Sequence, residues 1–496
     1  MQTGNSTLYW HDYETSGATP RWDRPFQFAG LRTDEALNEI GDPLVIYCQP
    51  ARDRLPHPEA CLLTGITPQM AEARGLPEPE FIALIHAQLA QPGTCGVGYN
   101  TLRFDDEVTR FALYRNFYDP YAREWQSGNS RWDVIDLARM TFALRPEGIN
   151  WPINGEGKPS FRLEDITAAN GLTHDSAHDA LSDVRATIAL ARLLRDQQPR
   201  LYDWLFRLRD KRAAGNLLDL KMHTPVLHTS RMYSSEYGCT TLVMPLLPET
   251  GNANSVLVYD LRHDPAEFIQ LDSDALAERL FTPKEELADG QQRLPVKAVR
   301  LNKCPALAPQ KVLNDEVANR IGLNVEQCQQ RWQLLLQHPD FMQRIKQAYS
   351  GNKVFAENDA DLALYDGFAS DHDRNLFPLV RDAKPEKLID LSEKFQDGRY
   401  TELLFRYRAR NFPDTLSVQE KHHWQMHCRR QLGENAINGS LTLNEYHHKL
   451  LQLRADCPQP TQQEVLNELE AWGRALAQEN DLPWPPDHSG SEEQTD

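Results

Sequence analysis

The sequence has no pair of cysteines spaced as Cys-x-x-Cys, no long apolar run and no internal repeat. Its eight cysteines are scattered along 496 residues, which excludes a zinc ribbon and fits a reducing compartment. No stretch approaches the roughly 18 consecutive apolar residues of a membrane span. The first seven residues lack the basic and apolar regions of a signal peptide. We therefore expect a cytoplasmic protein that does not associate with membranes.

The length of 496 residues predicts two or three domains with separate cores. A net charge of −18 argues at first against a partner rich in phosphate. The charge is unevenly distributed, however. Six acidic and no basic residues lie from Glu479 onward, whereas the segment 192–212 contains seven basic and three acidic residues. Local fields must therefore decide whether nucleic acid binds. We expect residues 481–496 to form an acidic disordered tail.

Strands and helices alternate in the first 198 residues, which predicts an α/β unit. Strands are expected over 7–14, 44–48 and 94–99, helices over 80–89 and 177–195, and a loop leading into helices over 62–69.

The rest of the chain has a different pattern. Short β-branched runs over 240–244, 255–259 and 296–301 predict a small β-rich domain over 199–351 with one or two helices. Apolar residues at helical spacing begin after residue 310 and predict a helical C-terminal domain over 354–480. The segments with that spacing are 316–348, 385–411, 416–433 and 442–479.

Acidic residues along the first unit are the main chemical signal. Asp12 and Glu14 end the first strand on one face, and Asp105 follows a later strand. His178 precedes Asp183 by five residues, about 140° around a helix, so His178 lies either on another face or in the preceding loop. Clusters of oxygen ligands of this kind bind hard cations such as Mg²⁺ and Mn²⁺.

The ordered set Asp-x-Glu, Phe-Asp and His-x4-Asp resembles the DEDDh family of 3'-to-5' exonucleases, which has the ribonuclease H-like fold of proofreading subunits. Further motifs resemble the bacterial exodeoxyribonuclease I family through about residue 475. They are Phe117-Tyr-Asp-Pro-Tyr121, Leu144-Arg-Pro-Glu-Gly-Ile-Asn-Trp-Pro152, Pro159-Ser-Phe-Arg-Leu163, Asn302-Lys-Cys-Pro305 and Tyr407-Arg-Ala-Arg-Asn-Phe-Pro413. The resemblance implies an α/β DEDDh exonuclease domain (1–198), an SH3-like domain (199–351) and a helical C-terminal domain (354–480), which together enclose single-stranded DNA.

The same resemblance implies that Asp12, Glu14, Asp105 and Asp183 hold two Mg²⁺ ions, which Mn²⁺ can replace, and that His178 is the general base. The spacing of Asn100 from the Phe-Asp pair is longer than in the family, so either Asp105 or Asp106 could be the ligand. We choose Asp105 because it directly follows Phe104. Two divalent ions would neutralise four carboxylates and allow an anionic phosphodiester to be attacked by water.

Aromatic residues interleaved with arginines over 110–125 suit stacking on single-stranded bases. Phe111, Tyr114 and Tyr118 have the spacing of a buried helical stripe, whereas Tyr121 and Trp125 match DNA-contacting positions in the family. Residues that the resemblance places at the substrate are Glu14, Arg110, Tyr121, Trp125, Arg139 and Arg162, with Arg162 nearest the terminal nucleotide. The basic runs 192–212 and 406–410 either line a groove or form solvated helix faces.

The resemblance also implies a partner, the acidic, Phe-ended C-terminal tail of bacterial single-stranded DNA-binding protein. Arg145 matches the family's docking site for this tail, and the region 307–338 offers further basic and apolar residues. These are Lys311, Arg320, Arg331, Leu313, Ile321, Trp332 and Leu335.

Taken together, we expect a monomeric exonuclease that degrades single-stranded DNA from the 3' end to 5'-mononucleotides in repair and recombination. One alternative is a 3'-to-5' ribonuclease or proofreading subunit, which has no need of the residues beyond 198. A second alternative is a non-catalytic binding module. The presence of all five active-site residues argues against that module.

Overall fold

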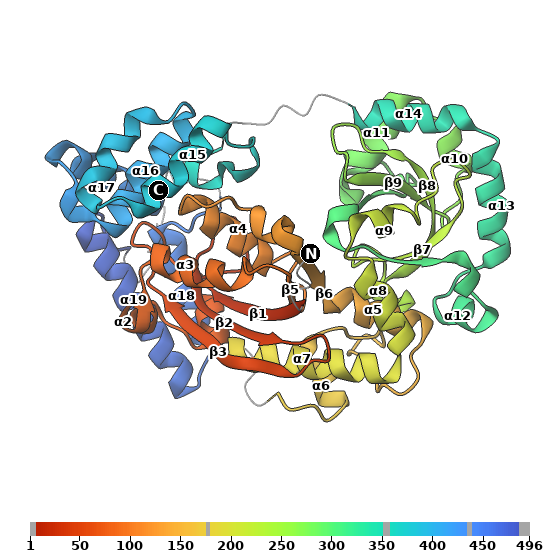
Figure 1. Ribbon diagram of the computed structural model, residues 1–496, viewed down its shortest axis with the longest axis horizontal. Helices are drawn as coiled ribbons and strands as arrows, with labels where there is room; N and C mark the ends of the chain where they lie inside the picture. The colour runs from red at the N-terminus through yellow and green to blue at the C-terminus, as the bar shows by residue number, and fades with distance from the viewer. Residues whose placement is uncertain (1–5, 175–178, 351–357, 434–438, 486–496) are drawn as a thin grey trace, which may run out of the picture.

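The computed structural model describes residues 6–174, 179–350, 358–433 and 439–485 (Figure 1). Its N-terminal α/β unit lies between a second unit, which is built on a separate sheet, and a C-terminal helical region. No helix within these four ranges is long and apolar enough to cross a membrane.

A six-stranded mixed sheet in the order β4-β3-β2-β1-β5-β6 forms the N-terminal unit. Its strands are β1 (Thr7–Thr15), β2 (Pro25–Thr33), β3 (Glu39–Cys48), β4 (Gly75–Leu76), β5 (Thr94–Gly98) and β6 (Ser130–Asp133). Its helices are α1 (Pro58–Thr64), α2 (Pro68–Arg74), α3 (Glu78–Leu89), α4 (Asp105–Arg115), α5 (Val134–Leu144), α6 (Leu163–Ala169) and α7 (Ala180–Gln197), with 3-10 turns η1 (Ala122–Glu124) and η2 (Gln126–Gly128).

The side chains of β1 point alternately into two core layers, one on each face of the sheet. Leu8 and Trp10 pack in one core with α5 and α7, whereas Tyr9 and Tyr13 pack in another with α3 and α4. Because side chains alternate across a strand, Asp12 shares the face of Leu8 and Trp10. The first strand therefore directs its even-numbered residues toward α7.

Two sequence predictions for this unit need correction. Strand β2 was not predicted, because eight of its nine residues are buried and its pattern does not alternate. The segment 62–69 is not one loop, since α1 runs to Thr64 and α2 begins at Pro68. Gly65 ends α1 with φ of 69°, a left-handed conformation that favours glycine.

The second unit has a five-stranded antiparallel sheet in the order β10-β9-β8-β7-β11. The strands are β7 (Val226–Thr229), β8 (Thr240–Pro248), β9 (Ser255–Asp260), β10 (Val296–Arg300) and β11 (Ala306–Pro309). Helices α8 (Pro199–Arg207) and α9 (Lys211–Gly215) connect it to the first unit. Short 3-10 turns are η3 (Ser235–Tyr237), η4 (Lys284–Glu286), η5 (Leu301–Lys303) and η6 (Gln310–Val312).

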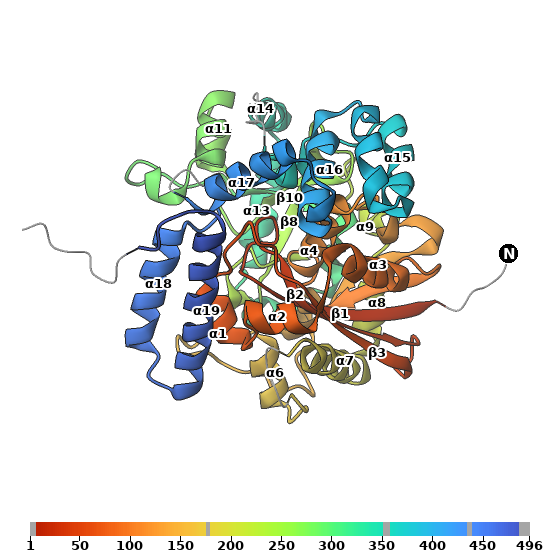
Figure 2. The ribbon, with the colours of Figure 1, turned by 90° about the vertical axis from the view of Figure 1, so that its left-hand side faces the viewer.

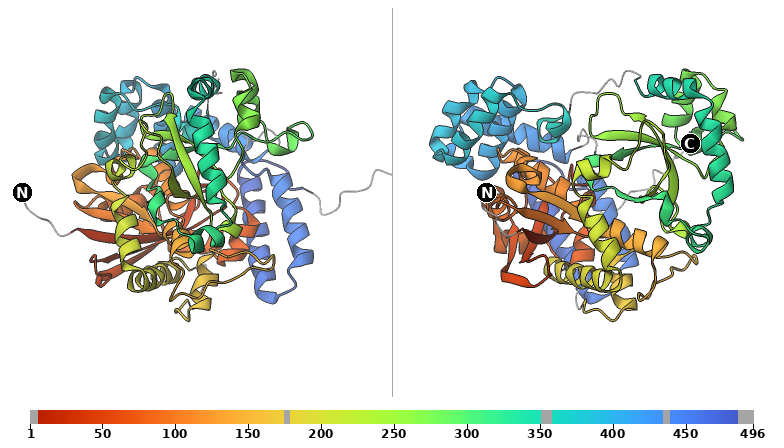
Figure 3. Two further views of the ribbon diagram at one scale, coloured as in Figure 1. Left: turned by 90° about the vertical axis from the view of Figure 1, so that its right-hand side faces the viewer. Right: turned by 45° about the vertical axis from the view of Figure 1, so that its right-hand side comes forward.

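The prediction of one or two helices in this unit is wrong. It contains α10 (Ala266–Ile269), α11 (Ser273–Phe281), α12 (Asp315–Arg320), α13 (Val325–Leu336) and α14 (Pro339–Tyr349). The segment 316–348, which was predicted to be helical, forms α12, α13 and α14, with Asn314 and Asn324 as caps of the first two. Helices α10 and α11 were not predicted, and Asp272, which caps α11, was the missed signal. Figure 3 shows α13 and α14 beside the sheet of this unit.

The C-terminal region is helical, as predicted, with more breaks than expected. It comprises η7 (Ala360–Tyr365), α15 (Asp371–Asp382), η8 (Pro385–Lys394), α16 (Gly398–Asn411), η9 (Pro413–Thr415), α17 (Val418–Leu432), α18 (Leu443–Asp456) and α19 (Pro460–Glu479). The segment 442–479 forms the hairpin of α18 and α19 seen in Figure 2, because the chain turns before Pro460. Leu482 and Trp484 pack against this hairpin, so the predicted tail does not begin at residue 481. Its residues 486–496 lie outside the described ranges.

The expectation of separate cores is also wrong. One core cluster joins Trp10 and Trp132 of the first unit to Leu227 and Phe341 of the second. Another joins Phe111, Tyr114 and Phe117 to α15 and α16, which confirms two members of the predicted stripe. Tyr118 lies beyond the end of α4 and is half-buried.

Candidate active site

Three carboxylates meet at the end of β1. Asp12 and Glu14 come from this strand and Asp183 from the first turn of α7, and one ligand oxygen of each lies within 4.8 Å of the others. The Asp179 side chain caps α7 by accepting a hydrogen bond from the Ser182 amide. The sequence alternation of β1 and the start of α7 therefore bring distant acids together.

The carboxylates at this site resist ionisation together. Burial raises the pKa of Asp12 well above its ordinary range, and the charges of Asp105, Glu14 and Asp183 raise it further. Burial, followed by Asp183, Asp105 and Asp179, raises the pKa of Glu14 to about 9. A buried cluster of like charges is strongly unfavourable without a counter-charge.

Asp105 and Asp106 occupy different environments. One oxygen of Asp105 accepts a hydrogen bond from the Tyr13 amide at 3.0 Å, beside Asp12. Asp106 instead accepts hydrogen bonds from Arg123 at 2.6 Å and Arg131 at 2.8 Å. Burial opposes ionisation of Asp106, but these guanidinium groups hold its pKa below the usual range. The geometry therefore supports Asp105 as the fourth acid.

The loop that leads to Asp105 is fixed by another aspartate. Asp133, at the end of β6, accepts hydrogen bonds from the amides of Asn100 at 2.8 Å, Leu102 at 3.2 Å and Ile135 at 3.1 Å. Asn100 has a positive φ of 64° at the start of this turn. The longer spacing between Asn100 and the Phe-Asp pair is thus accommodated by a turn that is hydrogen-bonded to the end of β6.

A histidine that the sequence analysis missed contacts the cluster. The Nε2 atom of His174 lies 2.5 Å from Oδ1 of Asp183, and its Nδ1 lies 3.1 Å from the Thr167 hydroxyl. His174 precedes His178 by four residues, which was the available signal. The predicted general base His178 lies outside the described residues. Asp179 was also missed as an acid near Glu14.

The predicted aromatic contacts lie partly at the surface. Trp125 is 65% exposed. Tyr121 is half-buried, and its ring centroid lies 5.8 Å from that of Phe368, which is itself exposed and was missed by sequence analysis. Arg162 is largely exposed and pairs with Glu164. These side chains are accessible to a strand of DNA.

Two predicted basic contacts are buried instead. Arg110 donates to both oxygens of Glu124, at 2.7 and 2.8 Å, and to Glu107 at 2.8 Å. Arg139 donates to Asp136 at 2.7 Å. Both guanidinium groups already have carboxylate partners, and their contact with DNA stays a prediction.

The basic run 406–410 does not form a solvated face, because Arg406, Arg408 and Arg410 all pair with acidic residues. Arg406 and Arg408 are buried, whereas Arg410 also lines a cavity, so the groove alternative stays open for Arg410 alone. The basic run 192–212 is mixed, since Arg192 and Arg195 donate to the backbone of residues 36–37 whereas Arg207 and Arg212 are exposed.

The predicted partner site is only partly at the surface. Arg145 is half-buried and donates to its neighbouring Leu144 carbonyl at 2.5 Å. Ile321 and Leu335 are fully buried in the core, so they cannot form a docking pocket. Lys311 is exposed, and Arg320 and Trp332 are partly exposed.

Comparison with known proteins agrees with this architecture. Three family models match, described as Exonuclease over 9–191, Exonuclease I SH3-like domain over 209–351 and Exonuclease I C-terminal domain over 358–476. Exodeoxyribonuclease I of Escherichia coli strain K12 is 48% identical over 435 residues, which cover 88% of this chain and 91% of the relative. The chain belongs to the exodeoxyribonuclease I family. The predicted fold class and enzyme class are confirmed, and neither alternative matches these relatives.

Solved structures lead to the same family. A moderately thermophilic Exonuclease I from Methylocaldum szegediense is 49% identical with a TM-score of 0.91, covering 95% of this chain and 99% of that one. E. coli Exonuclease I in complex with a dA16 oligonucleotide is 45% identical with a TM-score of 0.91, covering 95% and 100%.

Two further similar structures contain other groups. A zinc-bound form of the E. coli ExoI–ssDNA complex is 44% identical with a TM-score of 0.91, covering 96% of this chain and 100% of that one. A structure titled SSB/Exonuclease I in complex with inhibitor CFAM is 43% identical with a TM-score of 0.87, covering 95% and 100%.

Proposed function

We propose that the protein removes nucleotides from the 3' end of single-stranded DNA, releasing 5'-mononucleotides by two-metal hydrolysis, and that it acts in DNA repair and recombination. The cluster of Asp12, Glu14 and Asp183 carries the proposal. The family's structure with an oligonucleotide supports the substrate class.

The chemistry of the donor set fits divalent metal ions. The electrostatic neighbours that raise the pKa of Asp12 and Glu14 are all acids. Carboxylate oxygens are the ligands that Mg²⁺ and Mn²⁺ prefer, and divalent ions would relieve the repulsion. Asp12, Glu14, Asp105 and Asp183 would hold two Mg²⁺ ions, with Mn²⁺ as a substitute. Bound metal would activate water and stabilise the leaving 3'-oxygen.

The side chains around the cluster have distinct roles in this proposal. His174 holds one oxygen of Asp183, and Thr167 fixes the other ring nitrogen of His174, so the Asp183 carboxylate is oriented. His178 takes the proton of the attacking water, because an imidazole titrates near neutral pH. The Tyr13 amide fixes Asp105 against the strand.

The DNA strand is proposed to run from this cluster along the exposed aromatic residues. Trp125 and Tyr121 stack on bases, and Arg162 and Glu14 contact the terminal nucleotide. Arg110 and Arg139 would have to exchange a carboxylate partner to reach a phosphate. Their contribution is therefore expected to be smaller than that of Arg162.

The direct test uses end-labelled single-stranded DNA, duplex DNA and RNA, each with and without Mg²⁺, with product lengths resolved on a gel. Stepwise shortening of single-stranded DNA from the 3' end, only with metal, is expected. Asp12→Asn should abolish this hydrolysis and leave DNA binding largely intact, because Asp12 holds metal. Turnover within tenfold of wild type in this variant would refute the metal assignment.

We also propose a partner, the acidic, Phe-ended tail of single-stranded DNA-binding protein, supported by the similar structure titled SSB/Exonuclease I. Arg145 and Arg320 lie on one boundary, since Arg320 donates to the Ala143 carbonyl at 3.2 Å. Fluorescence anisotropy with a labelled tail peptide should show micromolar binding that weakens with salt and with Arg145→Ala. Lys387→Ala, at an exposed lysine of the helical region, is the control. Equal binding by wild type and Arg145→Ala would refute the site.

For the organisation of the chain, we propose domains over 1–198, 199–351 and 354–480. The matched ranges 9–191, 209–351 and 358–476 support these boundaries. We further propose that the protein is a cytoplasmic monomer.

A further inference from the structure

The loop that follows Glu14 is closed by its own hydrogen bonds. The Ser16 amide donates to the Arg24 carbonyl at 2.8 Å, and the Arg24 amide donates to the Ser16 hydroxyl at 2.9 Å. The strand pairing shifts between Glu14 and Thr15, so the loop begins at a β-bulge. Loop 16–24 therefore fixes the end of the strand that carries Glu14.

This loop is held from outside by the helical region. Arg21 donates to the Leu362 carbonyl at 3.3 Å and to the side chain of Asn358. The Nη2 atom of Arg24 lies 3.5 Å from Oδ1 of Asp361. Two arginines of loop 16–24 thus reach the same short segment, 358–362, more than 330 residues later in the chain.

Asp361 is the centre of a buried network of charges. Arg410 donates to both of its oxygens, at 2.8 and 2.7 Å, and Arg406 donates to Oδ2 at 2.8 Å. Burial opposes ionisation, but Arg410, Arg406 and Arg24 hold the pKa of Asp361 well below its ordinary range. Asp361 is 1% exposed, and its ionised carboxylate lies next to Arg24 of loop 16–24.

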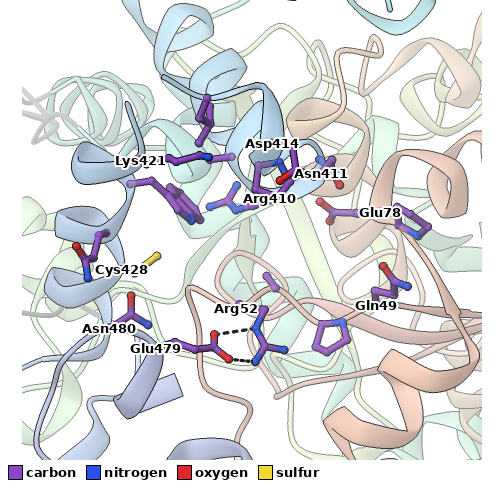
Figure 4. Close-up of a pocket in the computed structure, with 18 of the residues that line it drawn as sticks. Gln49, Arg52, Glu78, Arg410, Asn411, Asp414, Lys421, Cys428, Glu479 and Asn480 are labelled. Carbon is purple, nitrogen blue, oxygen red and sulfur yellow. Dashed lines mark hydrogen bonds and ion pairs between the residues drawn. The ribbon is translucent and has the colours of Figure 1, made fainter. Parts of the chain in front are cut away.

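The hold on Arg24 depends on charge. Its Nε and Nη2 atoms are buried without a hydrogen-bond partner among the described residues. Arg24 also lines a cavity of about 740 Å³ between the end of β3, α16, α17 and α19. Figure 4 shows this cavity, with Arg410 on one side and the paired Arg52 and Glu479 on another. Arg24 therefore has space to move if Asp361 loses its charge.

We infer that Asp361 is a positioning residue, through which the helical region holds loop 16–24 and keeps Glu14 in place for metal binding. This inference rests on the proposed function. It assigns the helical region a part in forming the catalytic site, besides enclosing DNA. A small displacement of a reacting or ligating group, from a change distant from the chemistry, costs up to about 10²-fold in rate.

The test compares Asp361→Asn with wild type on the p-nitrophenyl ester of thymidine 5'-monophosphate, which is too short to span a DNA groove. We expect kcat to fall roughly tenfold to a hundredfold. Calorimetric titration with Mn²⁺ should show affinity weakened at least about tenfold, a change that loss of DNA enclosure alone would not produce. Asp371→Asn is the matched control, because Asp371 lies in the same region and is 94% exposed.

Wild-type ester hydrolysis and wild-type Mn²⁺ affinity in Asp361→Asn would overturn the inference, even if degradation of long DNA became distributive. If Asp361→Asn does not fold, Arg21→Ala removes the other contacts between loop 16–24 and the segment 358–362, and it should lower kcat and Mn²⁺ affinity in the same direction. Unchanged values in that variant would likewise overturn it. A wild-type protein that binds Mn²⁺ but cleaves neither substrate would refute the proposed function, while the Mn²⁺ affinities would still decide the role of Asp361.

Discussion

Two adjacent aspartates, Asp105 and Asp106, are equally buried and chemically identical, yet their partners give them opposite roles. Asp105 faces other acids, whereas Asp106 is paired with Arg123 and Arg131. Removing one partner of a buried ion pair leaves uncompensated charge and costs about 3–5 kcal/mol.

We therefore predict that Asp106→Asn lowers the free energy of unfolding by about 3–5 kcal/mol. Asp105→Asn should abolish turnover with a free energy of unfolding near that of wild type, because it removes charge from a repulsive cluster. Denaturant unfolding and exonuclease assays on both variants check this pair of outcomes. The reverse pattern would show that Asp106 is the metal ligand.

The raised pKa of Glu14 predicts how pH acts on the metal-free protein. Its pKa rises from an ordinary 4.5 to about 9, so between these values the folded state binds more protons than the unfolded state. The free energy of unfolding should therefore fall as pH rises through this window. Metal binding should release protons, which calorimetry in two buffers of different ionisation enthalpy detects. Glu14→Gln should reduce both effects, and an unchanged pH dependence in this variant would contradict the prediction.

At the scale of residues, the sequence predicted what depends on local spacing. The period of two along β1 was enough to place Asp12 and Glu14 on one face. The contact of His174 with Asp183 and the pairing of Arg410 with Asp53 could not be predicted, because they join residues whose neighbourhood is set by tertiary packing. The run 406–410 looked like a basic surface for this reason.

At the scale of elements, the 3-10 turns η1 and η2 carry Trp125 between them at the surface. Base stacking on an aromatic side chain contributes about 1–3 kcal/mol. Trp125→Ala should weaken binding of a labelled oligothymidylate by that amount at fixed salt, measured by fluorescence anisotropy. Leu63→Ala, at a leucine of α1 that is 60% exposed, should bind like wild type. An equal loss in both variants would contradict a stacking role.

Elements with a clear period or a marked composition were predicted, whereas β2 and the shortest elements were not. Helix α3 has apolar residues at helical spacing, and β1 was recognised by its aromatic residues although it is buried on both faces. Strand β2 is covered on both faces, and α10 has only four residues, so neither shows a period. The division of 442–479 into two helices was signalled only by Pro458 and Pro460.

At the scale of the whole molecule, the units share their cores. Trp132 of the first unit packs edge-on against Tyr202 and Phe206 of α8, with ring centroids 5.1 and 5.0 Å apart. These contacts lie beyond residue 198, where the sequence places the domain boundary. A cut there exposes a large apolar surface.

We predict that residues 1–198 expressed alone do not melt cooperatively, and that the first and second units of the full chain unfold in one transition. Differential scanning calorimetry of both proteins checks this. Two well-resolved transitions in the full chain, or a sharp melt of the truncated protein at the temperature of one of them, would show that the shared core contributes little to stability.

The buried network around Asp361 also limits how sequences of this kind can diverge. Arg410 pairs with both Asp53, which follows β3, and Asp361, so a change of Arg410 alone removes an ion-pair partner from two buried carboxylates at once. The first unit and the helical region must then be inherited as a matched pair. A hybrid enzyme that takes its helical region from a distant relative needs the residues at positions 53, 361 and 410 from the same parent.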